Sequence, residues 1–246
     1  MMDLRPTPTT ISWIDQTGST NTDLLQLVNS LQPPAEGWWL VAERQTAGRG
    51  RRNRAWQDGT GNFTGSTAIR IRHSDPPAAS LSLVAGLALH EVMAPLVPAG
   101  TMVLKWPNDL LVGGAKIAGI LLERCADHVV VGVGVNLSTA PDLPDRRTVA
   151  LSAFGPGPDR SIFATNLAHS MALEVERWRC FGLESVRAKW MAAAHPVGTR
   201  LRVHAPGGQA VEGQFCGLDD NGALCLRMAD NTMEVIAAGD VLLVGA

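Results

Sequence analysis

The character of this chain changes near Pro196, and the change limits the folds that it can adopt. Before that point strand-like and helix-like segments are mixed, whereas after it short alternating segments are separated by turn-forming residues. The separators are Pro206-Gly207-Gly208, Asp219 to Gly222 and Ala229 to Asn231. Short strands spaced in this way over about 50 residues are typical of a small β-barrel. At 246 residues the chain can form one larger and one small domain, and we expect them at 1–195 and 196–246.

The first 195 residues predict a mixture of strands and helices, and therefore an α+β fold. Residues 63–72 alternate in character, which predicts a strand with unlike faces. Gly113-Gly114 is typical of a two-residue hairpin turn, and Thr20 with Asp23 resembles a helix-capping box. Further strands are expected at 11–14, 38–43, 102–106, 109–112, 115–123 and 128–136. Helical spacing predicts helices at 24–31, 77–97, 162–180 and 183–194.

Composition argues against several classes of function. The formal net charge is −2, which disfavours broad electrostatic binding to DNA or membranes. The four cysteines form no Cys-x-x-Cys pair, so neither a zinc site nor a disulfide framework is expected. Reduced thiols favour a cytoplasmic protein. The N-terminus lacks the apolar core of a signal peptide, and no run is expected to be long and apolar enough to span a membrane.

The segment 47–56 combines two glycines, four arginines and one tryptophan. Glycines let the backbone approach a ligand closely, and guanidinium groups bind carboxylate or phosphate oxygens in pairs. Trp56 offers a flat face for a ring. These properties predict a loop that closes over a small anionic molecule. From the residues alone, a basic surface turn or a nucleic-acid patch is the alternative.

A second group of polar residues lies on strands that otherwise look buried. Lys105 and Asp109 are followed, beyond the hairpin turn, by Lys116. Lysine and aspartate are rarely buried unless they are paired. Taken singly, the lysines fit an alternative in which they extend to solvent. Together with Gly119 and Asn136, however, they predict several polar groups that converge beside one hairpin.

These segments resemble motifs of the biotin protein ligase family. The matching motifs, in family order, are Ser19-Thr20-Asn21, Gly48-Arg49-Gly50-Arg51-Arg52, Lys105-Trp106-Pro107-Asn108-Asp109, Lys116-Ile117-Ala118-Gly119-Ile120 and Val133-Gly134-Val135-Asn136. Each motif is weak alone, but five in order are specific. The resemblance implies that residues 1–195 form a mixed β-sheet catalytic domain of the biotin/lipoate protein ligase type with flanking helices. It also implies that residues 196–246 form an SH3-type β-barrel.

The resemblance implies an ATP-dependent reaction in two steps. Biotin and ATP give biotinoyl-5′-AMP and pyrophosphate. A lysine of a biotin carboxyl carrier protein or domain, in acetyl-CoA carboxylase or a related carboxylase, then displaces AMP. Mg²⁺ would bridge the ATP phosphates, and no dedicated metal ligands are expected on the chain. The expected partners are biotin, ATP and the carrier, with no DNA and no membrane. A homodimer stays open, because family members form dimers through the catalytic sheet.

The resemblance also assigns roles to residues. The catalytic residues would be Lys116, Arg51 and Asp109. The residues in contact with biotin would be Ser19, Thr20, Asn21, Gln45, Arg49, Gly50, Arg51, Lys116 and Gly119. The residues in contact with ATP or the adenylate would be Gly48, Arg49, Gly50, Arg51, Arg52, Arg54, Trp56, Lys105, Trp106, Asn108, Lys116 and Asn136. Asp109 has two open roles, as proton acceptor for the attacking lysine and as structural cap of the hairpin.

Some features depart from the family pattern or leave alternatives. The first predicted strand begins at Ile11, which leaves no room for the winged helix-turn-helix that many members carry, so DNA binding is not expected. Asn62-Phe63-Thr64-Gly65 stands where the family has Asn-Leu-Tyr, and this changes the pocket wall. The alternative function is a lipoate or octanoate protein ligase or transferase of the same fold. An octanoyltransferase would need a nucleophilic cysteine, for which Cys125 is the candidate. A regulator without turnover is disfavoured by Arg51 and Lys116.

Overall fold

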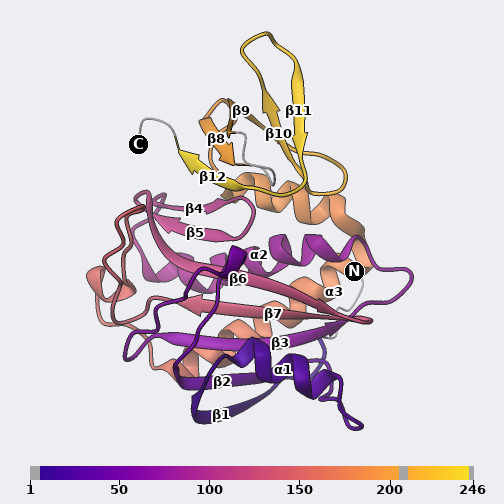
Figure 1. The fold of residues 1–246 in the computed structure, drawn as a ribbon, viewed down its shortest axis with the longest axis vertical. Coiled ribbons are helices and arrows are strands. Elements are labelled where there is room, and N and C mark those ends of the chain that lie inside the picture. Colours follow the sequence, from indigo (N-terminus) through magenta and orange to yellow (C-terminus); the bar gives the residue numbers. More distant parts are fainter. Residues whose placement is uncertain (1–5, 205–209, 244–246) are drawn as a thin grey trace.

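The computed structural model describes residues 6–204 and 210–243. Within them a mixed seven-stranded sheet has the order β1-β2-β3-β7-β6-β5-β4 (Figure 1). Its strands are β1 (Thr10–Thr17), β2 (Trp38–Gln45), β3 (Phe63–Arg70), β4 (Met102–Lys105), β5 (Asp109–Val112), β6 (Ala115–Cys125) and β7 (His128–Val135). The β1–β2 pair is parallel and the other neighbours are antiparallel. The predicted α+β class with a mixed sheet is confirmed.

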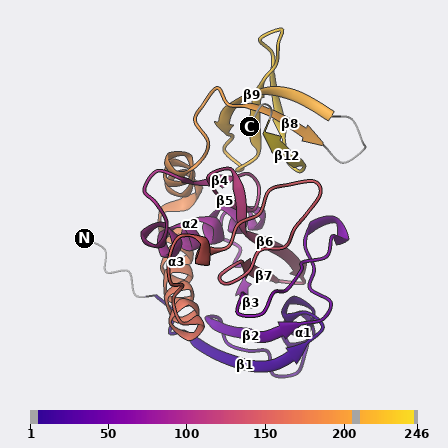
Figure 2. The same ribbon diagram turned by 90° about the vertical axis from the view of Figure 1, so that its left-hand side faces the viewer.

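Helices cover both faces of this sheet. The α-helices in the described part of the chain are α1 (Thr20–Val28), α2 (Leu81–Met93) and α3 (Arg160–Ala193). Helices α2 and α3 lie on one side, and α1 lies on the other against β3 and β7 (Figure 2). Short 3₁₀ turns occupy η1 (Arg51–Asn53), η2 (Ala78–Ser80), η3 (Ala94–Leu96) and η4 (Leu151–Ala153). The sheet is therefore buried on both faces where these helices cross it.

Strand β3 lies between β2 and β7 in the sheet. The strand predicted over 63–72 ends at Arg70, and it is buried from Phe63 to Ile69 on both faces. Phe63 packs into the main core. The polar Thr64 and Ser66 are buried as well, because α1 covers the other face. The two faces thus differ in chemistry, but both are buried.

The start of α1 differs from the predicted capping box. Ser19 is the N-cap and makes no side-chain capping bond to the described residues. The Thr20 hydroxyl donates to Gln45 Oε1 instead, and the Asp23 carboxylate accepts from the Thr17 hydroxyl. The predicted capping box is therefore wrong, because both side chains are used by neighbouring strands. The helix also ends at Val28, earlier than the predicted end at residue 31.

One stretch of the described residues, Ala78–Leu96, is long and apolar enough by length and composition to cross a membrane. The expectation that no run would reach this length is therefore wrong. The stretch contains α2, whose Leu81, Val84, Ala88 and Leu89 are fully buried. Helix α2 packs against α3 and the sheet. Its apolarity is accounted for by this core position, since a helix apolar on most sides is what a buried site requires.

The α3 element is broken at Gly182, as the two predicted helices at 162–180 and 183–194 require. Asp159 caps its N-terminus, accepting from the backbone N–H of Ser161 and Ile162. Gly182 has φ 73° and ψ −176°, a region of backbone conformation that is essentially restricted to glycine. The break lets Trp178 and Trp190, on opposite sides of it, both reach the core.

The C-terminal part of the chain forms a separate sheet. Within 200–204 and 210–243 the strands are β8 (Arg200–His204), β9 (Ala210–Leu218), β10 (Leu224–Arg227), β11 (Met233–Ile236) and β12 (Asp240–Leu243). They form an antiparallel sheet of order β11-β10-β9-β8-β12, which confirms the small β-domain. The predicted turns at Asp219–Gly222 and 229–231 join its strands, whereas Pro206-Gly207-Gly208 lies outside the described residues.

The C-terminal sheet packs against the larger part of the chain through an aromatic contact and a hydrogen bond. Phe215 of β9 meets Trp190 of α3 at a ring-centroid distance of 6.5 Å. The indole of Trp106 donates to the Gly222 carbonyl at 3.0 Å. One core cluster contains residues of both sheets. The C-terminal sheet therefore packs directly over the β4–β5 hairpin, while the domain boundary at 195/196 stays a prediction.

We predict that Gly182→Ala lowers the free energy of unfolding by about 1–3 kcal/mol, because alanine is strained at this backbone conformation. Urea denaturation followed by circular dichroism measures the change. Gly157→Ala is the matched control, since Gly157 is exposed and a Cβ there meets only the Leu137 carbonyl at 3.9 Å. Its effect should stay below about 0.5 kcal/mol. Equal stability of the two variants would show that the backbone at Gly182 is not strained.

Candidate active site

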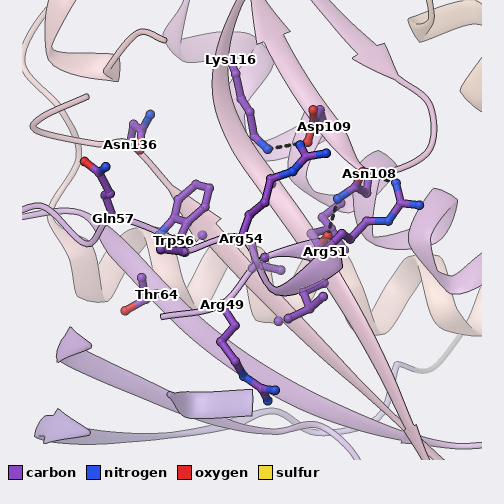
Figure 3. A pocket seen from close by; sticks show the side chains of 18 of the residues that line it. Arg49, Arg51, Arg54, Trp56, Gln57, Thr64, Asn108, Asp109, Lys116 and Asn136 are labelled. Carbon is purple, nitrogen blue, oxygen red and sulfur yellow. Dashed lines mark hydrogen bonds and ion pairs between the residues drawn. The ribbon is translucent and has the colours of Figure 1, made fainter. Parts of the chain in front are cut away.

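A cavity of about 370 Å³ lies over β6 and β7, between the start of α1, the β5–β6 hairpin and the loop 48–56. It gathers residues from all five sequence motifs around one space. Those predicted site residues that line it are Ser19, Thr20, Asn21, Gln45, Arg49, Gly50, Arg51, Arg54, Trp56, Asn108, Asp109, Lys116, Gly119 and Asn136. Figure 3 shows several of these side chains directed toward the same space. The fold thus brings together residues more than 100 positions apart.

One end of the cavity, at the start of α1, is lined by uncharged polar groups that bond to one another and to the Arg49–Glu123 ion pair. The backbone N–H of Thr20 donates to Gln45 Oε1 at 2.8 Å. Its hydroxyl lies 2.7 Å from that of Ser66, which donates to Asn21 Oδ1 at 2.6 Å. The Asn21 amide in turn donates to Glu123 at 2.8 Å. These bonds fix the orientation of the donors and acceptors at this end.

The other end holds a buried carboxylate between two lysines. Asp109 is 9% exposed, and its carboxylate lies 2.6 Å from Lys116 Nζ and 3.4 Å from Lys105 Nζ. Sheet register causes this proximity, because Asp109 pairs with Lys105 across β4–β5 and with Gly119 across β5–β6. Burial alone would raise the pKa of Asp109, but the charges and hydrogen bonds of Lys116 and Lys105 hold it below its usual value. Burial lowers the pKa of Lys105, which the charge of Asp109 partly offsets.

The loop 48–56 folds back on itself over the cavity. Gly50 N–H donates to the Arg54 carbonyl at 2.7 Å, and Trp56 N–H donates to the Gly48 carbonyl at 2.9 Å. Arg51 donates to Asn108 Oδ1 at 3.3 Å. Arg49 points away from the lysine and arginine groups (Figure 3) and binds Glu123 at 3.0 Å. Arg49 and Arg51 of the loop therefore lie at different ends of the cavity.

Trp56 lies against glycines of β6 and β7. A Cβ added at Gly134 would overlap the indole, and one at Gly119 would lie 3.3 Å from it and 3.0 Å from Lys116 Nζ. Lys116 Nζ lies 5.8 Å from the indole centroid, within the range of a cation–π contact. The indole Nε1 is buried and has no hydrogen-bond partner among the described residues. The glycines thus create the room that this ring occupies.

The remaining predicted site residues lie outside this cavity as far as the described chain shows. Gly48 packs against Trp56, where a Cβ would come within 2.8 Å of the Trp56 carbonyl oxygen. Arg52, Lys105 and Trp106 line a second cavity of about 600 Å³ between the β4–β5 hairpin and the C-terminal sheet. Trp106 is 5% exposed, and its indole bond to Gly222 gives it a structural function.

Sequence reasoning missed several lining residues. Gly132 and Gly134 alternate with valines in β7, and that period of two on a glycine-interrupted strand was a usable signal for a ligand-facing side. The loop residues Asp145 and Arg146 carried no such signal, because only the tertiary structure brings them to the cavity. The further lining residues are Ala55, Gln57, Thr64, Gly65, Ile120, Leu121, Val133, Pro141, Leu143, Thr148 and Asp240.

Backbone bonds hold the loop 139–150 at this wall. The N–H of Lys116 donates to the Arg147 carbonyl at 2.9 Å, and its carbonyl accepts from Val149 N–H at 3.0 Å. The strand that carries Lys116 therefore also fixes a loop for which the sequence predicted no role.

The carboxylates around the cavity are occupied by cations. Asp109 is bound by lysines, Glu123 by Arg49, Asp145 by Arg146 and Asp240 by arginines of the loop. In the part of the chain that the structure describes, no group of three His, Cys, Asp or Glu side chains could hold a metal ion. These residues do not by themselves form a Mg²⁺ site.

Comparison with known proteins agrees with this geometry. The biotin/lipoate A/B protein ligase family model matches residues 13–136, and the biotin protein ligase C-terminal domain model matches 200–244. The biotin--[acetyl-CoA-carboxylase] ligase of Mycobacterium tuberculosis is 40% identical over 93% of this chain and 87% of that protein. The one of Paracoccus denitrificans is 37% identical over 94% and 99%. The Aquifex aeolicus biotin protein ligase structure with biotin and ATP superposes with a TM-score of 0.80 at 24% identity, over 95% and 97% of the two chains.

The fold and both family matches define the class to which the protein belongs. The chain is a member of the biotin/lipoate A/B protein ligase family, and its C-terminal match and its relatives identify it within that family as a biotin protein ligase.

We predict that Asp109→Asn lowers the free energy of unfolding at pH 7 by about 3 kcal/mol, because two lysines lose their shared counter-ion. The pKa of Asp109 is lower in the folded protein than in the unfolded chain. Its contribution is therefore fully present above the unfolded pKa and is lost as the pH falls through the folded value. The difference from wild type should shrink below about pH 4.

Urea denaturation at several pH values measures this difference. Asp15→Asn, a change at an exposed position of β1, is the control and should alter stability by less than about 0.5 kcal/mol throughout. A difference for Asp109→Asn that does not vary with pH would contradict the assigned ionisation.

Proposed function

We propose that this protein is an ATP-dependent ligase that activates biotin as biotinoyl-5′-AMP and transfers biotin to a lysine of the carrier protein or domain of acetyl-CoA carboxylase or a related carboxylase. The supporting observation is one cavity with a neutral polar network at one end and a cationic group at the other. The relatives named above carry this activity in their names. Structures of the same fold hold biotin and ATP in Aquifex aeolicus and biotinylated ATP in Helicobacter pylori.

The neutral end is suited to the ureido ring of biotin. That ring presents N–H donors and a carbonyl acceptor, and amide and hydroxyl groups can match both. Ser19, Thr20, Asn21 and Gln45 supply such groups at the start of α1. Thr20 and Asn21 are fixed by bonds to Ser66 and Glu123, and the Gln45 side chain is fixed by accepting from Thr20. These groups are therefore pre-organised for a ligand, which reduces the entropy that binding costs.

The cationic end is suited to the first chemical step. The biotin carboxylate must approach the ATP α-phosphate, and two anions repel each other. Lys116, Arg51, Arg54 and Arg146 face this part of the cavity, and fixed cations stabilise charge that develops at phosphorus and on the leaving pyrophosphate. The cations in the lining outnumber the carboxylates, so the site keeps net positive charge for these anions. Trp56 offers an aromatic face for the adenine.

The second step transfers the biotinoyl group to an amine. A lysine with a pKa of about 10.4 is almost fully protonated at pH 7, so it must lose a proton to solvent before its amine attacks the anhydride carbonyl. The new amide bond forms as the bond to AMP breaks, and AMP leaves. Asp109 has a lowered pKa and stays ionised. We assign it to hold Lys116 in place and to orient the incoming ammonium, since a carboxylate of low pKa attracts a cation better than it retains a proton.

Mg²⁺ is proposed to arrive bound to ATP. It would neutralise phosphate charge there, as is usual for nucleotide phosphates, and the chain supplies no cage for it among the described residues. We also assign the protein to the cytoplasm, where ATP is available and thiols stay reduced. The absence of DNA binding stays a prediction, and formation of a homodimer stays open.

The competing function is lipoate or octanoate ligation on the same fold. A transferase of that kind would attack through a cysteine, but no cysteine of the described chain lines the cavity. Cys125 lies at the far end of β6, where it bonds with Asn29. These observations favour activation of the acid by ATP.

The deciding experiment is a labelling assay with a purified carrier domain, ATP and Mg²⁺, run in parallel with biotin and with lipoate. We expect covalent labelling by biotin, and at least about 100-fold less by lipoate, because a site built to hydrogen-bond the ureido group rejects a ligand that lacks it. Mass spectrometry of the carrier measures both products. Transfer of lipoate without biotin would show the proposed substrate to be wrong.

Lys116→Ala should reduce biotin-dependent pyrophosphate release by about 100-fold to 1000-fold, the usual loss on removal of one charge-stabilising donor. Lys105→Ala is the comparison variant, because it removes the other counter-ion of Asp109 while the wall of the cavity stays in place. It should cost about tenfold or less. If the two variants lose the same activity, Lys116 acts only as a counter-ion of Asp109. Thermal unfolding of each variant verifies that the fold is retained.

A further inference from the structure

A carboxylate of the C-terminal sheet binds the arginine loop from the opposite side of the cavity. Asp240, at the start of β12, lies 2.9 Å from Arg52 Nη1 and 3.8 Å from Arg51 Nη1, and it also pairs with Arg54. The neighbouring Gly239 carbonyl accepts from Arg51 at 3.0 Å. Three guanidinium groups of one loop therefore converge on a single turn of the other sheet.

Backbone bonds within the loop and a bond from Arg52 to the His204 carbonyl also hold this shape, but the shape carries costs of its own. Arg52 and Asn53 adopt positive φ values of 54° and 57°, which are unfavourable for residues with side chains. No residue of η1 is buried. The side chains of Arg51, Arg52 and Arg54 also repel one another through their like charges. An anion placed between them offsets both costs, and in the described protein Asp240 is that anion.

The charge balance leaves the loop ready to bind a further anion. One carboxylate faces three guanidinium groups, so positive charge remains in excess. Asp240 lines both the main cavity and the second cavity. Its side chain is 18% exposed, which weakens screening by solvent. A phosphate group entering the main cavity therefore meets arginines that are already gathered but not neutralised.

We propose that Asp240 is a positioning residue for nucleotide binding, by which the C-terminal sheet arranges Arg51, Arg52 and Arg54 before ATP arrives. This rests on the proposed function, because ATP is taken as the anionic ligand. Pre-organised groups bind a ligand more tightly than groups that must be ordered on binding. Loss of Asp240 therefore weakens ATP binding, although Asp240 is not required to touch ATP.

The test uses three variants of the full chain. Asp240→Asn keeps the size of the side chain and removes its charge, and Asp240→Glu restores the charge. Asp220→Asn is the matched control, because Asp220 also lies in the C-terminal part and pairs with an arginine of α3, Arg187, away from the loop. Thermal unfolding of all three establishes that they remain folded.

The first readout needs no ligand and is independent of the proposed function. Trypsin cleavage after Arg51, Arg52 and Arg54, followed by mass spectrometry, should be about tenfold faster in Asp240→Asn, because loosened loops are cleaved in proportion to their open population. It should be unchanged in Asp220→Asn and near wild type in Asp240→Glu.

The second readout is steady-state pyrophosphate release. In Asp240→Asn the KM for ATP should rise about fivefold to tenfold, a loss within the range for partly buried charge pairs. The KM for biotin should stay unchanged, and Asp240→Glu should recover most of the loss. Unchanged loop cleavage, or an unchanged or lower KM for ATP in Asp240→Asn, would overturn the proposal. Failure of the wild-type protein to activate biotin would instead overturn the proposed function, and the cleavage result would still stand on its own.

Discussion

The site depends on one buried carboxylate. Asp109 lies between Lys116 and Lys105. Without it, two largely buried ammonium groups would be left without a counter-ion beside the hairpin. A buried pair of this kind adds little net stability compared with apolar residues, but it is costly to break. It fixes the Lys116 ammonium at one place in the cavity, and the rest of the cationic end is arranged around that point. Stability and ligand binding therefore depend on the same three side chains.

Small residues supply the second constraint. Gly119 and Gly134 lie on the adjacent strands β6 and β7 and have no side chains. Trp56 and the Lys116 side chain can therefore lie directly on the sheet. A glycine weakens a strand interior, and in an ordinary core strand it would be a defect. Here the strands are held on both sides by neighbours and are covered by helices, so the local loss is tolerated where close approach of a ligand is needed.

Much of the fold could be predicted from the sequence, because it follows from local rules. The hairpin around Gly113-Gly114, the break at residues 181–182 and the C-terminal strands follow from local turn and periodicity rules. The capping box at Thr20 failed because Gln45 and Ser66, both distant in sequence, bind the same side chain. The helix expected at 77–97 is found as the buried α2, and only the expectation that no run is long and apolar enough to span a membrane failed. Local rules cannot predict a competing partner that is distant in sequence and comes close only in the folded chain.

The sequence by itself determined the residue types of the site and the elements that carry them: a glycine-arginine loop after one strand, and a lysine and aspartate hairpin. Only the tertiary structure decided which of these side chains meet. Arg51 and Gly239 are separated by 188 residues, and Arg49 binds Glu123 rather than joining the other arginines. Such contacts follow from how the two sheets pack and from strand register. Packing and register depend on the summed burial of many apolar side chains, not on any motif.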